Sequence, residues 1–157
     1  MVHDLGKETN KESKTEMDTN TVNASAYYLL ICADGHVNEK ELLLGNTMIA
    51  VEGLDGKKFE DAIGTFKSQD KKQIYNLCIS GLKKMEKKKQ IRCVSWLSLI
   101  ANSDGFMDTK EWDLIYKIYN TELGISLNEI LKTQKEIKGA IGKCSVTCDV
   151  TLHYSLN

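Results

Sequence analysis

One stretch of this sequence occurs twice, and the repeat limits the folds that the chain can adopt. Residues 33–41 read ADGHVNEKE and residues 103–111 read SDGFMDTKE, at a constant offset of 70 positions. Apolar residues recur at helical spacing on both sides of each copy, so each unit is a helix, a loop, a second helix, a glycine stop and a further helix. Two such units should bury their apolar faces against each other as one globule, rather than form an extended solenoid.

The glycine stop differs slightly between the two copies. It is Gly53 in the first copy and Gly124 in the second, so the second copy contains one inserted residue. Seven segments in all have the apolar periodicity of helices, and no segment gives a convincing strand. The chain is therefore predicted to be all-α, a seven-helix bundle made of two pseudo-symmetric helical repeats. The second segment, about Glu39 to Val51, is apolar over most of its circumference, so we expect it to be the central helix.

The length of 157 residues suits one domain, large enough to bury roughly two thirds of the surface of its unfolded chain. Residues 1–20 contain few apolar groups, and ordering them would cost backbone entropy that little burial could offset. We therefore expect a disordered N-terminal tail at 1–20, a helical domain at 21–141 and a C-terminal tail at 142–157.

Each element of the repeated motif has a mechanical explanation. The glycines can adopt the left-handed conformation that ends a helix. The polar residue three positions after each glycine can accept a backbone N–H as an N-cap. The glutamate three residues further on can then reach back to complete a capping box. The three pairs are Gly35 and Gly105, Asn38 and Asp108, and Glu41 and Glu111.

The capping scheme leaves Asp34 and Asp104 unused. Aspartate before glycine is common in turns, where its side chain bonds to the following backbone, so turn chemistry alone can explain both residues. The alternative is a cation site, because carboxylates that converged from the two loops would suit calcium or magnesium. The loops lack the spacing of an EF-hand, since the glycine follows the aspartate directly. The candidate ligands are Asp34, Glu41, Asp104, Asp108 and Glu111.

Residues 24–48, with the motif at their centre, resemble the TerB-like family, which includes tellurite resistance protein B and the N-terminal domain of the DnaJ-type co-chaperone DjlA. The second copy, from Trp96 to Ile130, is similar to the same pattern, and together the copies cover about Val22 to Ile141. The resemblance implies a seven-helix bundle with two similar halves, a TerB-like domain at 21–141 and a non-enzymatic role in stress response, such as tellurite resistance. It also implies divalent-metal binding at acidic positions of the kind found at Asp34, Glu41, Asp104 and Glu111.

The chain departs from that family in two respects. It contains no His-Pro-Asp tripeptide and no J domain, so stimulation of Hsp70 is not implied. His36 occupies a loop position where the family often has an acidic residue.

Composition and motifs exclude several classes of function. The formal net charge of −1 gives no overall attraction to nucleic acid or membrane. No phosphate loop, dinucleotide fingerprint, zinc-protease motif or serine-hydrolase elbow occurs, so we expect no enzyme. No apolar run approaches the length of a membrane span or signal peptide, which predicts a cytoplasmic protein. The odd number of cysteines, five, predicts reduced thiols rather than a disulfide framework.

Lysines gather between Lys83 and Arg92. Such a patch could meet phosphate, but a solvated lysine face is the simpler interpretation because no aromatic side chain interleaves with it. The sequence thus favours an interaction module that binds a protein partner and no nucleic acid. Whether that partner is associated with a membrane is left open. The alternative function is a domain that binds calcium or magnesium through the acidic loops.

Overall fold

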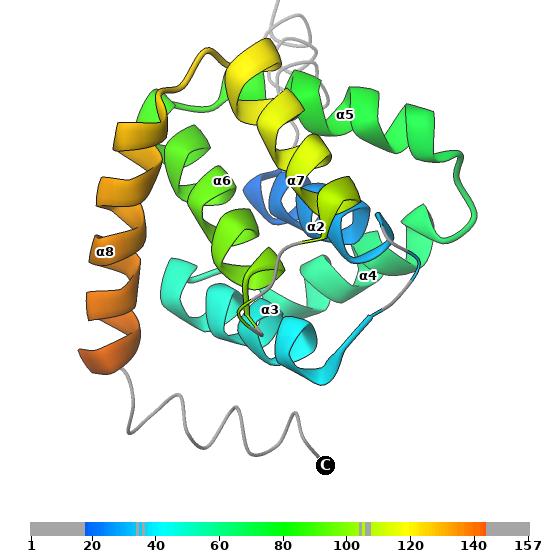
Figure 1. Ribbon diagram of the computed structural model, residues 1–157. Coiled ribbons are helices and arrows are strands. Elements are labelled where there is room, and N and C mark those ends of the chain that lie inside the picture. Colours follow the sequence, from blue (N-terminus) through cyan, green and yellow to red (C-terminus); the bar gives the residue numbers. More distant parts are fainter. Residues whose placement is uncertain (1–17, 34, 36, 104, 106–107, 144–157) are drawn as a thin grey trace, which may run out of the picture.

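The computed structural model describes residues 18–33, 35, 37–103, 105 and 108–143. These residues form seven α-helices and one π-helix, without a strand, which confirms the all-α prediction (Figure 1). The elements are α2 (Thr19–Ile31), α3 (Glu39–Glu52), α4 (Gly56–Phe66), α5 (Lys71–Lys84), α6 (Lys87–Ala101), α7 (Thr109–Tyr116), η1 (Lys117–Glu122) and α8 (Leu127–Lys143).

The first helix begins earlier than the sequence predicted. Asp18 is the N-cap of α2 and its side chain accepts a bond from the Asn20 N–H. The Asn20 side chain in turn accepts a bond of 2.8 Å from the Asp55 N–H, which ties this end of α2 to the start of α4. Residues 18–20 therefore belong to the helical domain and not to the N-terminal tail, because polar caps hold them without apolar burial. The rest of that tail, and the C-terminal tail from residue 144, lie outside the described residues.

The centre of the bundle is occupied by α2 and α6, which pack against each other. The α4 and α5 helices pack on α2, while α8 packs on α6 and lies at the left of Figure 1. The prediction that residues 39–51 form the central helix is wrong, since α3 packs mainly on α6 and leaves Leu42 47% exposed. Apolar composition alone could not identify the central helix, because α2 also contains buried polar residues such as Asn23 and Ser25.

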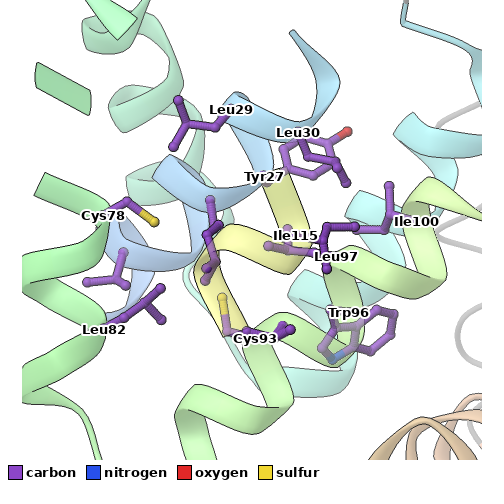
Figure 2. Close-up of a cluster of buried hydrophobic side chains, with 14 of the residues drawn as sticks. Tyr27, Leu29, Leu30, Cys78, Leu82, Cys93, Trp96, Leu97, Ile100 and Ile115 are labelled. Carbon is purple, nitrogen blue, oxygen red and sulfur yellow. The ribbon is translucent and has the colours of Figure 1, made fainter. Parts of the chain in front are cut away.

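The core is filled by side chains from both halves of the sequence. Leu30 of α2, Trp96 of α6 and Ile115 of α7 are completely buried together in it (Figure 2). Cys78 and Cys93 are buried in the same cluster, as the sequence predicted, and Cys32 is half-buried. Burial raises the pKa of the Cys78 thiol to about 11, so this cysteine is a neutral packing group rather than a nucleophile.

The local features predicted for the repeated motif are present in both copies. Gly35 and Gly105 have φ angles of 79° and 84°, and Gly53 and Gly124 have φ angles of 66° and 63°. Capping boxes start α3 and α7. The pseudo-symmetry of the two halves as whole units stays a prediction.

Candidate functional site

Three of the five acidic residues predicted to bind metal, Glu41, Asp108 and Glu111, lie at the starts of two helices. Glu41 accepts a bond of 3.1 Å from the Asn38 N–H, and Asn38 accepts one of 2.8 Å from the Glu41 N–H. Glu111 accepts a bond of 3.4 Å from the Asp108 N–H. The Glu41 and Glu111 residues are 2% and 3% exposed. These contacts are those of capping boxes, so the roles predicted for both glutamates at helix starts are confirmed.

The other two predicted ligands, Asp34 and Asp104, lie outside the described residues. Within the part of the chain that is described, no three histidine, cysteine, aspartate or glutamate side chains gather as a metal site would require. The cation site therefore stays a prediction.

A groove lies between α3 and α4. It has a volume of about 280 Å³. The two helices diverge here, since α3 packs mainly on α6 while α4 packs on α2. The α3 helix contributes four residues with the spacing i, i+3, i+4 and i+7, and α4 with its C-cap Lys67 contributes four more at the same spacing. The ten residues are Leu42, Gly45, Asn46 and Ile49 from α3, Glu60, Ile63 and Gly64 from α4 with the C-cap Lys67, and the aromatic residues Tyr27 of α2 and Phe59 of α4.

Two buried aromatic rings form the base of this α3–α4 groove. Tyr27 and Phe59 are 6% and 3% exposed, and their ring centroids are 5.7 Å apart. The Tyr27 hydroxyl donates a bond of 3.2 Å to the Glu41 carbonyl oxygen. Burial, followed by the nearby charge of Glu41, raises the pKa of Tyr27, so its hydroxyl stays protonated as a donor.

Each of the two helices beside the groove has a glycine in the groove lining. A Cβ at Gly45 would lie 2.7 Å from the Tyr27 ring, so α3 can approach that ring only with glycine at this position. A Cβ at Gly64, on the opposite wall, would meet no atom within 4 Å. A side chain at position 64 would therefore extend into the groove without disturbing the fold. Gly64 lies inside a helix, where glycine costs about 1 kcal/mol relative to alanine.

A partly buried ion pair fixes α3 to the core. The Glu52 carboxylate accepts bonds of 2.9 Å from Arg92 Nε and 2.6 Å from Arg92 Nη2. It also accepts a bond of 2.9 Å from Trp96 Nε1. Burial alone would raise the pKa of Glu52, but the bonds from Arg92 and Trp96 and the charge of Arg92 outweigh it and lower that pKa. This pair holds one wall of the groove on α6.

Sequence reasoning missed the groove because it treated apolar periodicity only as a sign of burial. The signal was nevertheless present. The second segment has apolar residues on more than one face, and Gly45 and Gly64 each interrupt a helix at a position where no turn was expected. An apolar stripe beside a glycine inside a helix favours a surface that is left open for another helix.

Comparison of the chain with family models, with curated proteins and with solved structures found no match. The resemblance to the TerB-like family therefore depends on the two motif copies alone. Among the described residues, no helix has the length and apolar character needed to cross a membrane.

Proposed function

We propose that this protein is a non-enzymatic interaction module that binds an amphipathic helix of a partner protein in the α3–α4 groove. The observation that carries the proposal is the pair of stripes with spacing i, i+3, i+4 and i+7, one on each wall. That spacing forms the contact face of a packed helix. Two such faces that diverge over an apolar base create the seat for a third helix, which would insert its own side chains at the same spacing.

The size of the groove supports side chains as its occupants. Pockets that enclose a small molecule or cofactor have volumes of about 300 to 1,000 Å³. The α3–α4 groove, at about 280 Å³, is smaller and opens along the surface. One or two apolar side chains of a partner helix, such as leucine or phenylalanine, are therefore the better match.

Two charged side chains along the α4 wall, one within the helix and one at its C-cap, define the partner further. Glu60 and Lys67 both line the groove and are exposed. They are two helical turns apart, or about 10 Å along the axis. A complementary helix would carry a basic residue near Glu60 and an acidic residue near Lys67, with its apolar anchors between them.

A site-specific photocrosslink tests this function. A photoreactive phenylalanine replaces Leu42 on the rim of the groove, the crosslink is made in an extract of the source cells, and the captured segment is sequenced. We expect an amphipathic helix with apolar residues at i, i+3 or i+4, and i+7. The same segment, made as a peptide, should bind the purified protein, and Gly64→Phe should weaken that binding by about tenfold or more, because it fills the place of an anchor.

The matched control is Gly139→Phe. Gly139 also lies within a helix, α8, and a Cβ there likewise meets no atom within 4 Å. The control should leave peptide binding unchanged. Equal weakening by both variants, or a captured segment without helical periodicity, would contradict the proposed function.

The family resemblance adds one further expectation, a role in stress response such as tellurite resistance. It concerns the pathway in which the partner acts, and the crosslink experiment does not depend on it.

A further inference from the structure

A small cavity lies where segments of both halves of the chain meet, and we name it the junction cavity. It has a volume of about 90 Å³. Its lining comes from the first two turns of α2, the end of α3 with the loop after it, the connection after α5 and the first two turns of α6. It shares no lining residue with the α3–α4 groove, so nothing inferred from it depends on the function proposed for the groove.

A buried amide forms the inner end of the junction cavity. Asn23 lines the cavity and is only 6% exposed. Its Nδ2 donates a bond of 2.9 Å to the Thr19 carbonyl oxygen. Its side-chain oxygen accepts no hydrogen bond from any residue that the structure describes. A buried amide oxygen without a donor is costly, so a molecule that brought an O–H group into the cavity would be stabilised there.

The charged residues of the lining are two cations and one anion. Glu52 and Arg92 neutralise each other, through bonds of 2.9 Å from Arg92 Nε and 2.6 Å from Arg92 Nη2. Among the described residues, these bonds leave both N–H groups of Arg92 Nη1 available to another acceptor. Lys89 also lines the cavity and is exposed, so its ammonium group lies at the mouth. The lining is therefore suited to an anion that accepts charge-assisted hydrogen bonds from both cations.

The rest of the lining is apolar. Leu54 and Met85 are half-buried, and Cys93 is 2% exposed. Burial raises the pKa of the Cys93 thiol, so this side chain is a neutral part of the wall. An inorganic anion such as phosphate would place charged oxygens against these side chains, whereas a short alkyl group would bury apolar surface with them. The cavity therefore favours a small organic anion.

We propose that the junction cavity binds a small 2-hydroxycarboxylate, of the size of glycolate or lactate. The carboxylate would accept bonds from Lys89 and Arg92, and the hydroxyl would donate to the side-chain oxygen of Asn23. The alkyl part would lie against Leu54 and Met85. A cavity needs about 10 to 15 Å³ for each water-sized group, so this one holds roughly six, which is about the size of lactate. An ammonium group in place of the hydroxyl would add a positive charge beside two cations, which disfavours 2-amino acids.

Calorimetric titration of the full chain at neutral pH tests the ligand class. Lactate and glycolate should bind with a dissociation constant of about 1 mM or lower. Propionate has the size of lactate without its hydroxyl, and it should bind at least about tenfold more weakly, because it leaves the amide oxygen unpaired. Phosphate and alanine should not displace lactate. Equal binding of lactate and propionate would overturn the proposal, as would no heat with any carboxylate or tighter binding of phosphate.

Two lysine variants test the site itself. Lys89→Gln should weaken lactate binding at least about tenfold, because it removes a charge-assisted bond at the mouth. The matched control is Lys88→Gln, which removes the same charge at an adjacent exposed position outside the lining. It should leave lactate binding unchanged. Equal weakening by both variants would mean that only the overall charge matters, and the proposed site would be wrong.

A third variant tests the contact at the inner end. Asn23→Ala should abolish the preference for lactate over propionate, because the acceptor of the hydroxyl is gone. Circular dichroism shows whether this variant is folded, and the two lysine variants decide the question if it is not. A preference for lactate that persisted in folded Asn23→Ala would contradict the assigned orientation of the ligand.

Discussion

The two copies of the repeated unit begin alike and end differently. Each second helix begins with a capping box, and each is followed by a glycine of positive φ. In the first copy α3 stays a regular α-helix from Glu39 to Glu52. In the second copy α7 gives way at Lys117 to the π-helix η1, which ends at Glu122.

The inserted residue of the second copy explains the π-helix. The Leu54 N–H bonds to the Ile49 carbonyl, five residues back, whereas the Ile125 N–H bonds to the Tyr119 carbonyl, six residues back. Tyr119 matches Ile49 at the offset of 70 and Gly124 matches Gly53 at an offset of 71, so the second copy has four residues, Asn120 to Leu123, where the first copy has three. The fold thus accommodates an extra residue as one wide helical turn, and keeps both the cap before it and the glycine after it.

The copies also differ at the positions that form the groove. Gly45 and Asn46 of α3 correspond, at the offset of 70, to Ile115 and Tyr116. Gly45 thus allows α3 to pack directly on the Tyr27 ring in the first copy, while the second has a buried isoleucine and a half-exposed tyrosine at the same places. The same helical frame therefore carries a glycine packed on an aromatic ring in one copy and larger side chains in the other.

The largest expected effect comes from Glu52, whose counterpart in the second copy is Leu123. Glu52→Ala should lower the free energy of unfolding by about 3 kcal/mol, because it leaves the charge of Arg92 uncompensated in a partly buried site. Urea unfolding measures the change, and Glu52→Ala with Arg92→Ala completes a double-mutant cycle. A loss below about 1 kcal/mol would mean that this pair behaves like an exposed ion pair.

Replacing Gly45 by alanine tests the close packing of α3 on the Tyr27 ring, which the second copy lacks at this position. Helix propensity alone would favour alanine. We expect instead a loss of about 2 kcal/mol, since the new methyl group would press on the Tyr27 ring. With Tyr27→Ala in place, the same substitution should become stabilising. A gain in stability in the wild-type background would show that the ring can move away.

The loss of stability at acid pH should also reveal the contribution of the charged Glu52 side chain. Its pKa in the folded protein lies below the ordinary value of 4.5. The stabilisation is therefore fully present above that pH and is lost as the pH falls below it. The difference in unfolding free energy between the wild type and Glu52→Gln should shrink from pH 6 toward pH 3, as followed by urea unfolding at each pH. A constant difference would contradict the lowered pKa.

Deleting Asn120 should convert the second copy to the register of the first. We expect η1 to become a regular α-helix, which the amide signals of an NMR spectrum would report. Glu122 would turn away from Tyr75, whose hydroxyl now donates a bond of 2.9 Å to it. The cost should be about 1 kcal/mol, and Tyr75→Phe should then cost nothing further. Persistence of the wide turn after the deletion would show that tertiary contacts, rather than the extra residue, produce it.

The smallest effects should come from the features that the copies share. Asn38→Ala and Asp108→Ala should each cost about 1 kcal/mol, because each removes one N-cap. Thermal unfolding of the two variants gives the comparison directly. Calcium or magnesium affinity, measured by calorimetry on the same proteins, tests the acidic-loop alternative. If the two variants lost unequal amounts of stability, one of the capping boxes would have a role beyond starting its helix.

Local chemistry was determined by the sequence itself. The left-handed glycines, the two capping boxes and the helical character of seven segments follow from residue types at fixed spacing, because each depends on atoms only a few residues apart. The basic character of the segment from Lys71 to Arg92 is likewise a property of composition.

The tertiary structure decided which surfaces are covered. Nothing in the pattern of α3 says that Leu42 remains exposed or that Met48 is buried. The groove exists because α3 packs on α6 while α4 packs on α2, and Glu52 pairs with a residue 40 positions away. Such long-range choices depend on how all the helices share one core, and a periodic sequence specifies a face of a helix without specifying its partner.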